Sequence, residues 1–249
     1  MTQDEQNGNG KNSDEYIGKL VDSGDFNKVE EGLDDEALHN YLVDRIKDIT
    51  SQETKIITLV GGVASGKTTL AKGLVERLGS ADSITTDAFA AGTREYRHTQ
   101  YGKVENKYDL NLFRDKIEAL KQLQDGETLR LPQYDEITGI AAAAGEENFP
   151  KIVHKVDYFI IEGDFNFSEG REDLAIYFHV PDEIRTKNRV ARDVEQRGWV
   201  DTEKLEHDIR VRDEKQHFPF TLPNAEKADI LITVSENQGK YSYSIYSKA

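Results

Sequence analysis

The segment at residues 61–68, GGVASGKT, carries the strongest chemical signal in the chain. It fits the pattern G-x-x-x-x-G-K-[ST], in which glycines let successive backbone N–H groups point at phosphate oxygens. Lys67 would reach the β- and γ-phosphates of a nucleotide, and the Thr68 hydroxyl would bind Mg²⁺. We therefore interpret the segment as a phosphate-binding loop. The residues expected to contact the nucleotide are Gly61, Gly62, Val63, Ala64, Ser65, Gly66, Lys67, Thr68 and Thr69.

Two carboxylates end predicted strands near this loop. Asp87 ends the strand in SITTDAF, where it can accept the proton of an attacking hydroxyl; the alternative is that it caps the segment that follows. Glu162 ends the strand in YFIIEG, and we expect it to hold Mg²⁺ with Thr68, directly or through water. Asp164, two residues further on, competes for that role.

A run of positive charge lies between residues 185 and 197, with five basic residues and two acidic ones. Arg185, Arg189 and Arg192 have i, i+4, i+7 spacing and so share one helix face. Arg197 follows at the end of the run. Because a guanidinium donates two parallel hydrogen bonds, arginine suits a polyphosphate. We predict that two or three of these four arginines contact phosphate and that the others pair with neighbouring acids.

Strands alternate with helices in the predicted order of elements. Ile56–Val60 is a short buried strand before the loop, and residues 68–78 form a helix after it. The other expected strands are residues 82–86, 127–133, 156–161, 174–180 and 228–234, and the other expected helices are 34–49, 110–123 and 182–216, interrupted near Gly198. This order predicts an α/β fold with a P-loop NTPase-type parallel sheet flanked by helices, with an arginine-bearing segment at about residues 185–217.

Composition excludes several classes of function. The chain has 249 residues, of which 32 are basic and 47 acidic, and its net charge of -15 disfavours nucleic-acid binding. Cysteine is absent, which excludes disulfides, thiolate catalysis and cysteine-based zinc sites. The apolar runs are far shorter than the roughly 20 residues of a membrane helix. The polar first 30 residues do not resemble a secretory signal, so we expect a cytoplasmic protein without a membrane partner.

Taken in chain order, these segments resemble the uridine kinase, phosphoribulokinase and pantothenate kinase group of P-loop kinases over roughly residues 55–234. The loop and the lid segment NRVARDVEQRG are most similar to uridine kinases. The resemblance implies a kinase that uses ATP and Mg²⁺ to phosphorylate a hydroxyl of a small molecule. The catalytic residues that it implies are Lys67, Asp87, Arg189, Arg192 and Arg197.

Composition divides the chain into an acidic extension, residues 1–33, which has little apolar periodicity, and a P-loop kinase domain, residues 34–249. We expect the extension to be disordered or loosely docked, and its deletion to leave the affinity for MgATP nearly unchanged. Because the family is often oligomeric, a homo-oligomer is left open.

The acceptor side departs from the family. The segment PQYD places Tyr134 in the acceptor pocket, and Asp109 is what remains of a family stretch replaced here by VENKYDLN. The histidine that uridine kinases carry after the Pro-x-Tyr is absent. Weaker candidates for acceptor contacts are Arg94, Tyr96, Arg97 and His98. The residues therefore predict phosphoryl transfer and leave the acceptor unidentified.

Two other classes of function remain open on the sequence alone. One is a P-loop ATPase acting on a macromolecular partner, although the chain has no Asn-Lys-x-Asp motif for reading guanine. The other is a nucleotide-binding regulatory protein with a degenerate acceptor pocket. The presence of Lys67, Asp87 and Glu162 favours a working kinase over both.

Overall fold

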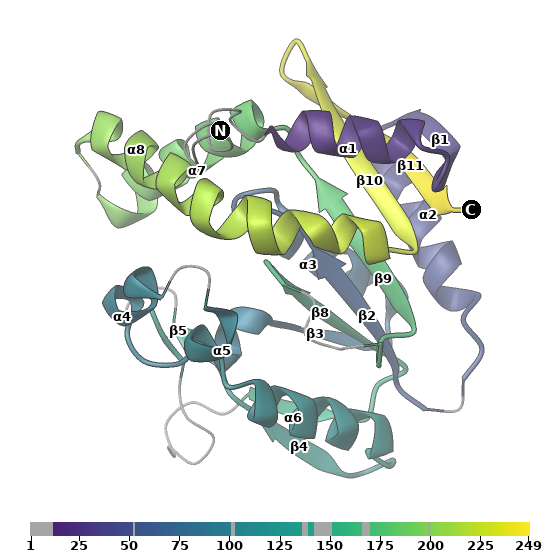
Figure 1. Ribbon diagram of the computed structural model, residues 1–249. Helices are drawn as coiled ribbons and strands as arrows, with labels where there is room; N and C mark the ends of the chain where they lie inside the picture. Colours follow the sequence, from purple (N-terminus) through teal and green to yellow (C-terminus); the bar gives the residue numbers. More distant parts are fainter. Residues whose placement is uncertain are drawn as a thin grey trace, which may run out of the picture.

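Strands and helices alternate along the chain, and Figure 1 shows a twisted sheet between helices. The computed structural model describes residues 12–51, 53–100, 103–135, 139–141, 151–165, 170–198 and 200–249, without the side chains of His98, Gln196 and Arg197. The helices are α1 (Ser13–Asp22), α2 (Asp35–Lys47), α3 (Lys67–Leu78), α4 (Arg94–Thr99), α5 (Val104–Lys107), α6 (Leu110–Gln122), α7 (Asp182–Arg197) and α8 (Thr202–Arg212). A 3₁₀ turn lies at Thr86–Phe89, and α8 continues into a π-helix at Asp213–Thr221 and a 3₁₀ helix at Leu222–Lys227.

The main sheet has seven strands, in the order β1-β11-β10-β9-β2-β8-β3. Their bounds are β1 (Phe26–Leu33), β2 (Lys55–Val60), β3 (Ala81–Thr85), β8 (Tyr158–Gly163), β9 (Leu174–His179), β10 (Ile230–Asn237) and β11 (Lys240–Lys248). The five strands from β10 to β3 are parallel, and β11 is antiparallel to both of its neighbours. Two short ribbons pair β4 (Thr128–Leu131) with β7 (Lys151–His154) and β5 (Tyr134–Asp135) with β6 (Ile140–Ala141). The predicted α/β class with a mostly parallel sheet is confirmed.

The register of the central strands places their carboxyl ends at one edge of the sheet. Val60 at the end of β2 pairs with Gly163 at the end of β8, and Thr85 at the end of β3 pairs with Glu162. Parallel strands need a crossover between them, so loops and helix starts gather at this edge. The phosphate-binding loop, Asp87 and Glu162 are therefore neighbours although they are far apart in the sequence.

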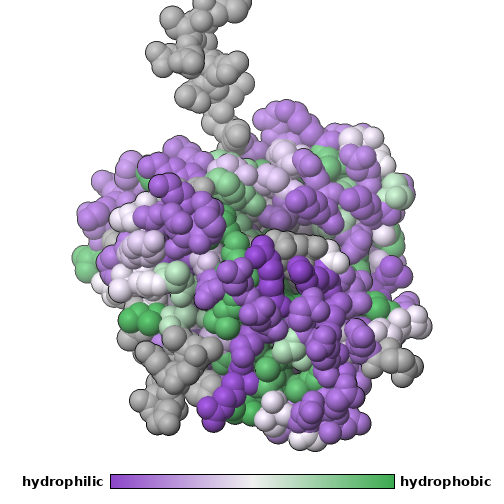
Figure 2. Space-filling model, turned by 60° about the horizontal axis from the view of Figure 1, so that its bottom comes forward, coloured by the Kyte–Doolittle hydropathy of each residue, from purple (hydrophilic) through white to green (hydrophobic). Residues whose placement is uncertain are grey.

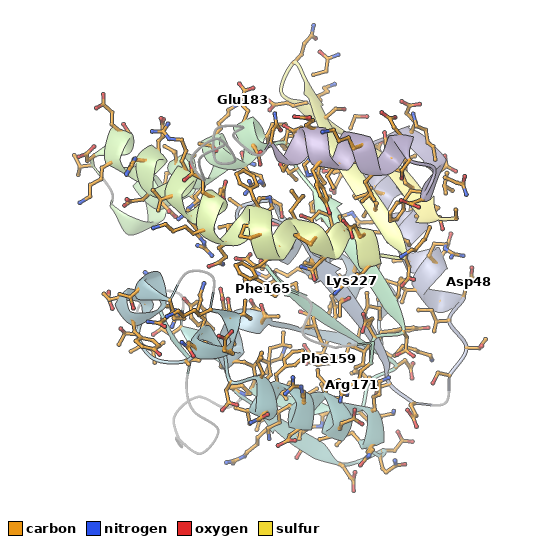
Figure 3. All side chains as sticks on the ribbon, in the orientation of Figure 1. Asp48, Phe159, Phe165, Arg171, Glu183 and Lys227 are labelled. Atoms are coloured by element: carbon orange, nitrogen blue, oxygen red, sulfur yellow. The ribbon has the colours of Figure 1, made fainter. Side chains whose placement is uncertain are left out.

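Helices cover both faces of the sheet because side chains of β2 alternate between them. Ile57 and Leu59 belong to a core formed with α2 and α3, whereas Ile56 packs in a second core with α6. Figure 3 shows Phe159 of β8 between the sheet and α6, in that second core. On α6 the residues Phe113, Ile117 and Leu120 are buried at i, i+4, i+7 spacing, as an amphipathic helix requires.

Residues 12–33 differ from the predicted loosely docked extension. The helix α1 packs in a third core through Ile17, and β1 pairs with β11 at the edge of the main sheet. Ser13 donates from its N–H and its hydroxyl to the carboxylate of Asp182 at the start of α7. These contacts come from residues more than 160 positions apart, which local composition does not reveal. The expectation of disorder also covered residues 1–11, which lie outside the described residues.

The surface of the face that comes forward in Figure 2 is mostly hydrophilic, with hydrophobic side chains in small areas between charged ones. That distribution matches a chain in which 32% of the residues are charged. Among the described residues, no helix is long and apolar enough to cross a membrane.

Candidate active site

The phosphate-binding loop joins β2 to α3 at the carboxyl edge of the sheet. Gly66 has φ = 90° in the left-handed region, which favours glycine, and the neighbouring Ala64 has φ = 61°. Gly66 is also the N-cap of α3, and within the described residues no side chain caps this helix. The N–H groups of its first turn therefore remain available to an anion, which the helix dipole also favours.

Lys67 is folded back over its own loop. Its Nζ donates to the carbonyl oxygen of Gly62 at 2.7 Å and to Oγ of Ser65 at 3.3 Å, and lies 3.7 Å from Oδ1 of Asp164. Burial lowers the pKa of Lys67, and the carboxylates of Asp164 and Glu162 act in the opposite direction. The ammonium is thus held where phosphate oxygens can replace its present partners.

Thr68 and Glu162 form a pair of oxygen ligands beside the loop. The Thr68 hydroxyl donates to Oε1 of Glu162 at 3.2 Å. Burial raises the pKa of Glu162, with Lys67 opposing the rise. In the described part of the chain, no group of three or more His, Cys, Asp or Glu side chains could hold a metal by itself. The oxygen atoms of Thr68 and Glu162 nevertheless fit Mg²⁺, which commonly binds one or two protein oxygens together with phosphates.

Asp87 and Asp164 are half-buried in the same site, and their pKa values are shifted in opposite directions. Burial, and then the charge of Asp164, raises the pKa of Asp87. Burial alone would raise the pKa of Asp164 too, but Arg212 and Lys67 outweigh it and lower this pKa. Nη2 of Arg212 lies 2.9 Å from Oδ2 of Asp164. Asp87 is therefore suited to take up a proton, whereas Asp164 is a fixed negative charge.

The contacts of Asp87 test the alternative role given above, in which its side chain caps the segment that follows. Thr85 caps the 3₁₀ turn, because its Oγ1 accepts from the backbone N–H of Asp87 at 3.3 Å. The Asp87 carboxylate instead accepts from the hydroxyl of Tyr108, at 3.4 Å from Oδ1. The capping role thus belongs to Thr85, and the Asp87 carboxylate lines the cavity.

Two of the predicted arginines, Arg189 and Arg192, line the cavity from α7. Nη2 of Arg192 lies 2.9 Å from Oδ1 of Asp193, and Nε of Arg189 lies 3.6 Å from Oδ2 of the same carboxylate. Burial, and then Arg212, lowers the pKa of Arg189 to about 10. Its buried Nε and Nη1 have no hydrogen-bond partner among the residues that the structure describes. Buried donors of this kind fit an anion that enters the site.

Arg185 lies behind the phosphate-binding loop rather than in the cavity. It pairs with Asp182 at 2.6 Å and with Asp213 at 3.0 Å. A Cβ on Gly62 would lie only 2.7 Å from Nη1 of Arg185, so the glycine gives this side chain its space. Helical spacing predicted that Arg185 could contact phosphate. In the structure its side chain contacts the loop but does not line the cavity. The side chain of Arg197, also predicted to contact phosphate, lies outside the described residues.

The two predicted acceptor residues have different places. Tyr134 lines the cavity, and its hydroxyl accepts from Nη2 of Arg97 at 3.2 Å. Asp109 is exposed, and its Oδ1 accepts from the N–H of Leu112, so it caps α6. The structure does not bring Asp109 to the cavity. The predicted contact of Asp109 with the acceptor is therefore corrected: this residue caps the start of α6.

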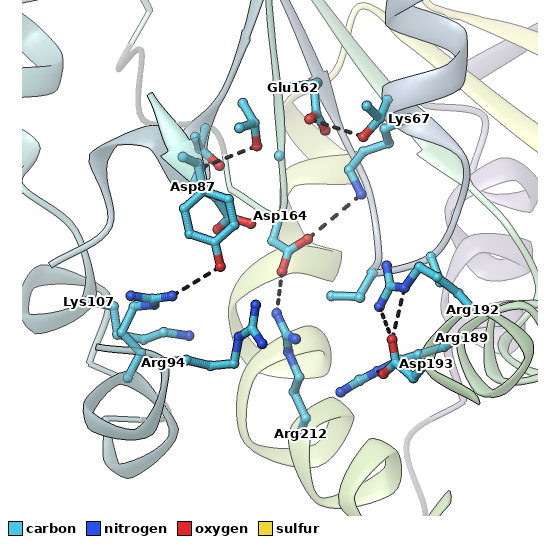
Figure 4. Close-up of a pocket in the computed structure, with 18 of the residues that line it drawn as sticks. Lys67, Asp87, Arg94, Lys107, Glu162, Asp164, Arg189, Arg192, Asp193 and Arg212 are labelled. Atoms are coloured by element: carbon cyan, nitrogen blue, oxygen red, sulfur yellow. Dashed lines mark hydrogen bonds and ion pairs between the residues drawn. The ribbon is translucent and has the colours of Figure 1, made fainter. Parts of the chain in front are cut away.

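Figure 4 shows these side chains around one cavity of about 750 Å³. In this view Lys67 and Glu162 lie on one side of it and Asp87 lies on the other, with Arg189 and Arg192 below Lys67. Thr68 and Tyr134 also line the cavity. That volume is typical of sites for small molecules.

Residues 56–239 match the phosphoribulokinase / uridine kinase family. The chain belongs to this family. It is 29% identical over 201 residues to a uridine kinase from Borrelia duttonii (strain Ly), an alignment that covers 78% of this chain and 93% of the relative.

Two solved kinases share the fold. A D-glycerate 3-kinase from Cryptococcus neoformans var. grubii serotype A has a TM-score of 0.54 at 14% identity, covering 83% of this chain and 99% of that one. The phosphoribulokinase from Rhodobacter spheroides has a TM-score of 0.51 at 19% identity, covering 74% and 71%. The predicted resemblance to this family is confirmed.

Several side chains of this family member's cavity were not selected from the sequence. Arg212 on α8 and Lys107 at the end of α5 both line it, and Tyr108 contacts Asp87 there. For Arg212 a signal exists, because Leu205, Asp208 and Arg212 fall at helical spacing on one face of α8 and all line the cavity. For Lys107 and Tyr108 the segment before α6 gives no periodic signal.

Proposed function

We propose that this kinase transfers the γ-phosphoryl group of ATP to a hydroxyl of a small metabolite, in the presence of Mg²⁺. The main support is that Lys67 of the phosphate-binding loop and Asp87, a half-buried carboxylate with a raised pKa, line one cavity. The lid arginine Arg189 faces the same space with buried donors. The family match and the uridine kinase relatives support a kinase over an ATPase or a regulatory protein.

A second cavity of about 270 Å³ supports a place for the nucleotide base. It adjoins the outer side of the phosphate-binding loop at Ser65 and Gly66, and Phe178, Val234 and Tyr243 contribute apolar walls. The only charged side chain that lines it among the described residues is Asp35. A largely apolar slot next to the loop suits a flat base, because apolar and aromatic side chains commonly line such sites.

Mg²⁺ would be held by Thr68 and Glu162, the oxygen pair beside the loop. When bound, it would neutralise charge on the phosphates. Asp164 is a weaker candidate for this role, because its carboxylate is already occupied by Arg212 and lies 3.7 Å from Lys67. The competition between Glu162 and Asp164 that the sequence leaves open is thus resolved, in our proposal, in favour of Glu162.

The chain's own residues then share the transfer. Asp87 accepts the proton of the acceptor hydroxyl, whose oxygen forms a bond to the γ-phosphorus while the bond to the bridging oxygen of ADP breaks. Lys67 and the N–H groups at the start of α3 bind the phosphates, and Arg189 and Arg192 bind the transferring group from the lid. A lid that closes over the site would exclude water, which otherwise competes as an acceptor.

Transfer from MgATP to a panel of nucleosides, hydroxy acids, sugars and sugar phosphates, followed by product mass, tests the proposal. We expect one phosphorylated product and a loss of at least about 1,000-fold in turnover in Lys67→Ala. Asp109→Asn is a matched control, because it is an exposed site and asparagine also caps helices well. ATP hydrolysis that only a protein partner stimulates, or ATP binding without transfer to any member, would contradict the proposal.

A further inference from the structure

Gln216 is a buried polar side chain that the transfer described above does not use. It lies in the π-helix that follows α8, and the residue is only 2% exposed. Its amide contacts two charged groups from distant parts of the chain. Oε1 accepts from Nζ of Lys107 at the end of α5, and Nε2 donates to Oδ2 of Asp164, just after β8, at 3.4 Å. One side chain thus joins three elements around the main cavity.

An uncommon type of helix carries Gln216. The π-helix is rare in proteins and often occurs at functional sites. Within this one, Asp213 pairs with Arg185 behind the phosphate-binding loop, whereas Gln216 contacts Asp164 at the strand end. Lys215 between them is exposed. The π-helix therefore directs two polar side chains inward, to different parts of the site.

The two partners of Gln216 require an amide at this position. An ammonium can only donate hydrogen bonds, and an ionised carboxylate can only accept them. Despite burial, Arg212 and Lys67 lower the pKa of Asp164, which keeps its carboxylate ionised. An amide has one acceptor and one donor group, so a single orientation of Gln216 satisfies both partners. A carboxylate in its place would repel Asp164, and an ammonium would repel Lys107.

Asp164 is itself held in place by other contacts. Nη2 of Arg212 lies 2.9 Å from Oδ2 of Asp164, the same oxygen that accepts from Gln216. Nζ of Lys67 lies 3.7 Å from the other oxygen, Oδ1. Figure 4 shows Asp164 between Lys67 and Arg212. An amide bound to this carboxylate has little freedom to move, so it can fix the group that binds its other end.

That group is a cation beside the proposed base. Lys107 lines the main cavity together with Asp87, and its Nζ lies 5.8 Å from the centre of the Tyr108 ring. The hydroxyl of this tyrosine donates to Oδ1 of Asp87. Figure 4 shows Lys107 on the same side of the cavity as Asp87. Burial, and then Asp164, raises the pKa of Asp87, and Lys107 acts in the opposite direction, toward the form that can take up a proton.

We infer that Gln216 is a positioning residue for phosphoryl transfer: bound to Asp164 at one end, its amide holds the ammonium of Lys107 at a fixed place beside Asp87. The inference rests on the proposed function. Gln216 does not line the main cavity, so it acts through Lys107 and not by contact with a substrate. Because Arg212 and Lys67 hold Asp164 without it, loss of Gln216 should affect turnover and leave the binding of MgATP unchanged.

A simpler role for Gln216 is to satisfy two buried charged groups and so stabilise the fold. Loss of hydrogen bonds to charged groups does lower stability. The two roles predict different results in folded variants. A residue that only stabilises leaves the turnover of the folded enzyme unchanged. A residue that positions Lys107 lowers turnover, and this loss disappears once Lys107 has been replaced.

The test is a double-mutant cycle of Gln216→Met and Lys107→Met, assayed with MgATP and with uridine or whichever other compound of the panel above is phosphorylated fastest. Gln216→Met keeps the length of the side chain and removes both hydrogen bonds. We expect kcat to fall about 10-fold or more, with the KM for MgATP unchanged within about twofold. In an enzyme that already carries Lys107→Met, the same change should lower kcat by less than about twofold.

Two further variants complete the test. Lys215→Met is the matched control, because Lys215 is exposed on the same π-helix and does not line the cavity. Its kcat should stay within about twofold of the unchanged enzyme. Gln216→Asn keeps a buried amide but is one methylene shorter, and it should lower kcat as Gln216→Met does. Thermal unfolding shows whether each variant is folded.

Three outcomes overturn the inference while leaving the proposed function intact. One is full kcat in folded Gln216→Met or in folded Lys107→Met. Another is an equal loss of kcat from Gln216→Met with and without Lys107→Met, which would show that Gln216 does not act through Lys107. The third is failure of both Gln216 variants to fold, which would assign the residue to stability. Binding of MgATP by the unchanged enzyme with transfer to no compound of the panel would instead contradict the proposed function itself.

Discussion

The side of the cavity that we propose for the nucleotide is built from long regular elements, whereas the side that we propose for the acceptor is built from short ones. Lys67 and Thr68 begin α3, which follows β2 and the phosphate-binding loop, and Glu162 lies on β8, the strand that pairs with β2. The acceptor side instead comes from α4 and α5, of six and four residues, and from the two-residue strands β5 and β6. One side is fixed by a buried sheet, and the other by contacts such as those of Arg97 with backbone carbonyls.

This difference separates two kinds of function. A phosphate-binding side set by the sheet can stay constant while the acceptor side changes, since short surface segments tolerate substitution better than buried strands. Changes on the nucleotide side should therefore reduce transfer to every acceptor. Changes on the acceptor side should alter which acceptor is used. The following predictions test that separation.

The largest effect is expected for Asp87→Asn, at the boundary between the two sides. Turnover should fall on the order of 1,000-fold for every acceptor, because the amide cannot accept the hydroxyl proton. Thermal unfolding should show unchanged or higher stability at neutral pH, since the variant no longer buries a carboxylate whose pKa is raised. Full activity in the folded variant would remove Asp87 as the base.

The next effect concerns the lid. Arg189→Met should lower kcat about 100-fold for all acceptors, because Arg189 faces the transferring group with buried donors. Arg185→Met is the informative contrast, because it removes the buried cation that pairs with Asp182 and Asp213 and should cost about 3 kcal/mol of the free energy of unfolding. If Arg189→Met lost only stability and kept its turnover, the two arginines would have been assigned the wrong way round.

The pH dependence is expected to follow Asp87. Its folded-state pKa is raised by burial, so below that pKa the carboxyl is protonated and cannot act as a base. A profile of kcat/KM should therefore fall toward acid at a pH above the value near 3.9 of an ordinary aspartate. The stability that this group contributes is present below its unfolded pKa and is lost as the pH rises through the folded one. If kcat/KM fell only at the pKa of an ordinary aspartate, the assignment of Asp87 as the base would be contradicted.

A smaller effect, confined to acceptor use, is expected for Arg97→Lys. The ammonium keeps the charge but cannot bond Gly92, Gly139 and Tyr134 together. The KM for the acceptor should rise about tenfold while the KM for MgATP stays constant, as measured by steady-state kinetics with each substrate varied. An equal rise in both values would mean that the two sides are not independent.

The smallest effect is expected for Tyr108→Phe. This change removes the hydroxyl that donates to Asp87 at 3.4 Å and keeps the ring, which packs edge-on against Phe165. Turnover should fall about threefold to tenfold, in line with the loss of one hydrogen bond. No change in turnover would show that Asp87 needs no support from the acceptor side.

The sequence predicted the elements around the phosphate-binding loop because each of their signals is local. The pattern of residues 61–68 needs only a strand before it and a helix after it, and both are found, as β2 and α3. The strand ends at Asp87 and Glu162 could be read from short apolar runs. Helical spacing predicted that Arg185, Arg189 and Arg192 share one face of a helix. It did not show which of them reach the cavity, and Arg185 packs behind the loop instead.

The acceptor side and the N-terminal segment could not be predicted in the same way. Asp109 was chosen by resemblance, but in the fold it caps α6. Ser13 bonds to Asp182, and β1 joins β11, across most of the length of the chain. Because of these contacts, deleting residues 1–33 should destabilise the domain, an effect separate from the affinity for MgATP, which is expected to change little.

The sequence by itself determined the phosphate-binding loop, the alternation of strands and helices, and the residue types available for phosphoryl transfer. These features depend on residues close together in the sequence, whose spacing decides how their side chains are placed. Only the tertiary structure decided that Asp87 and Asp164 have opposite pKa shifts, since Arg212 reaches Asp164 from a helix 48 residues away. It also decided that Lys67, Asp87, Tyr134 and Arg189 line one cavity, because side chains far apart in the sequence come together only when the chain folds.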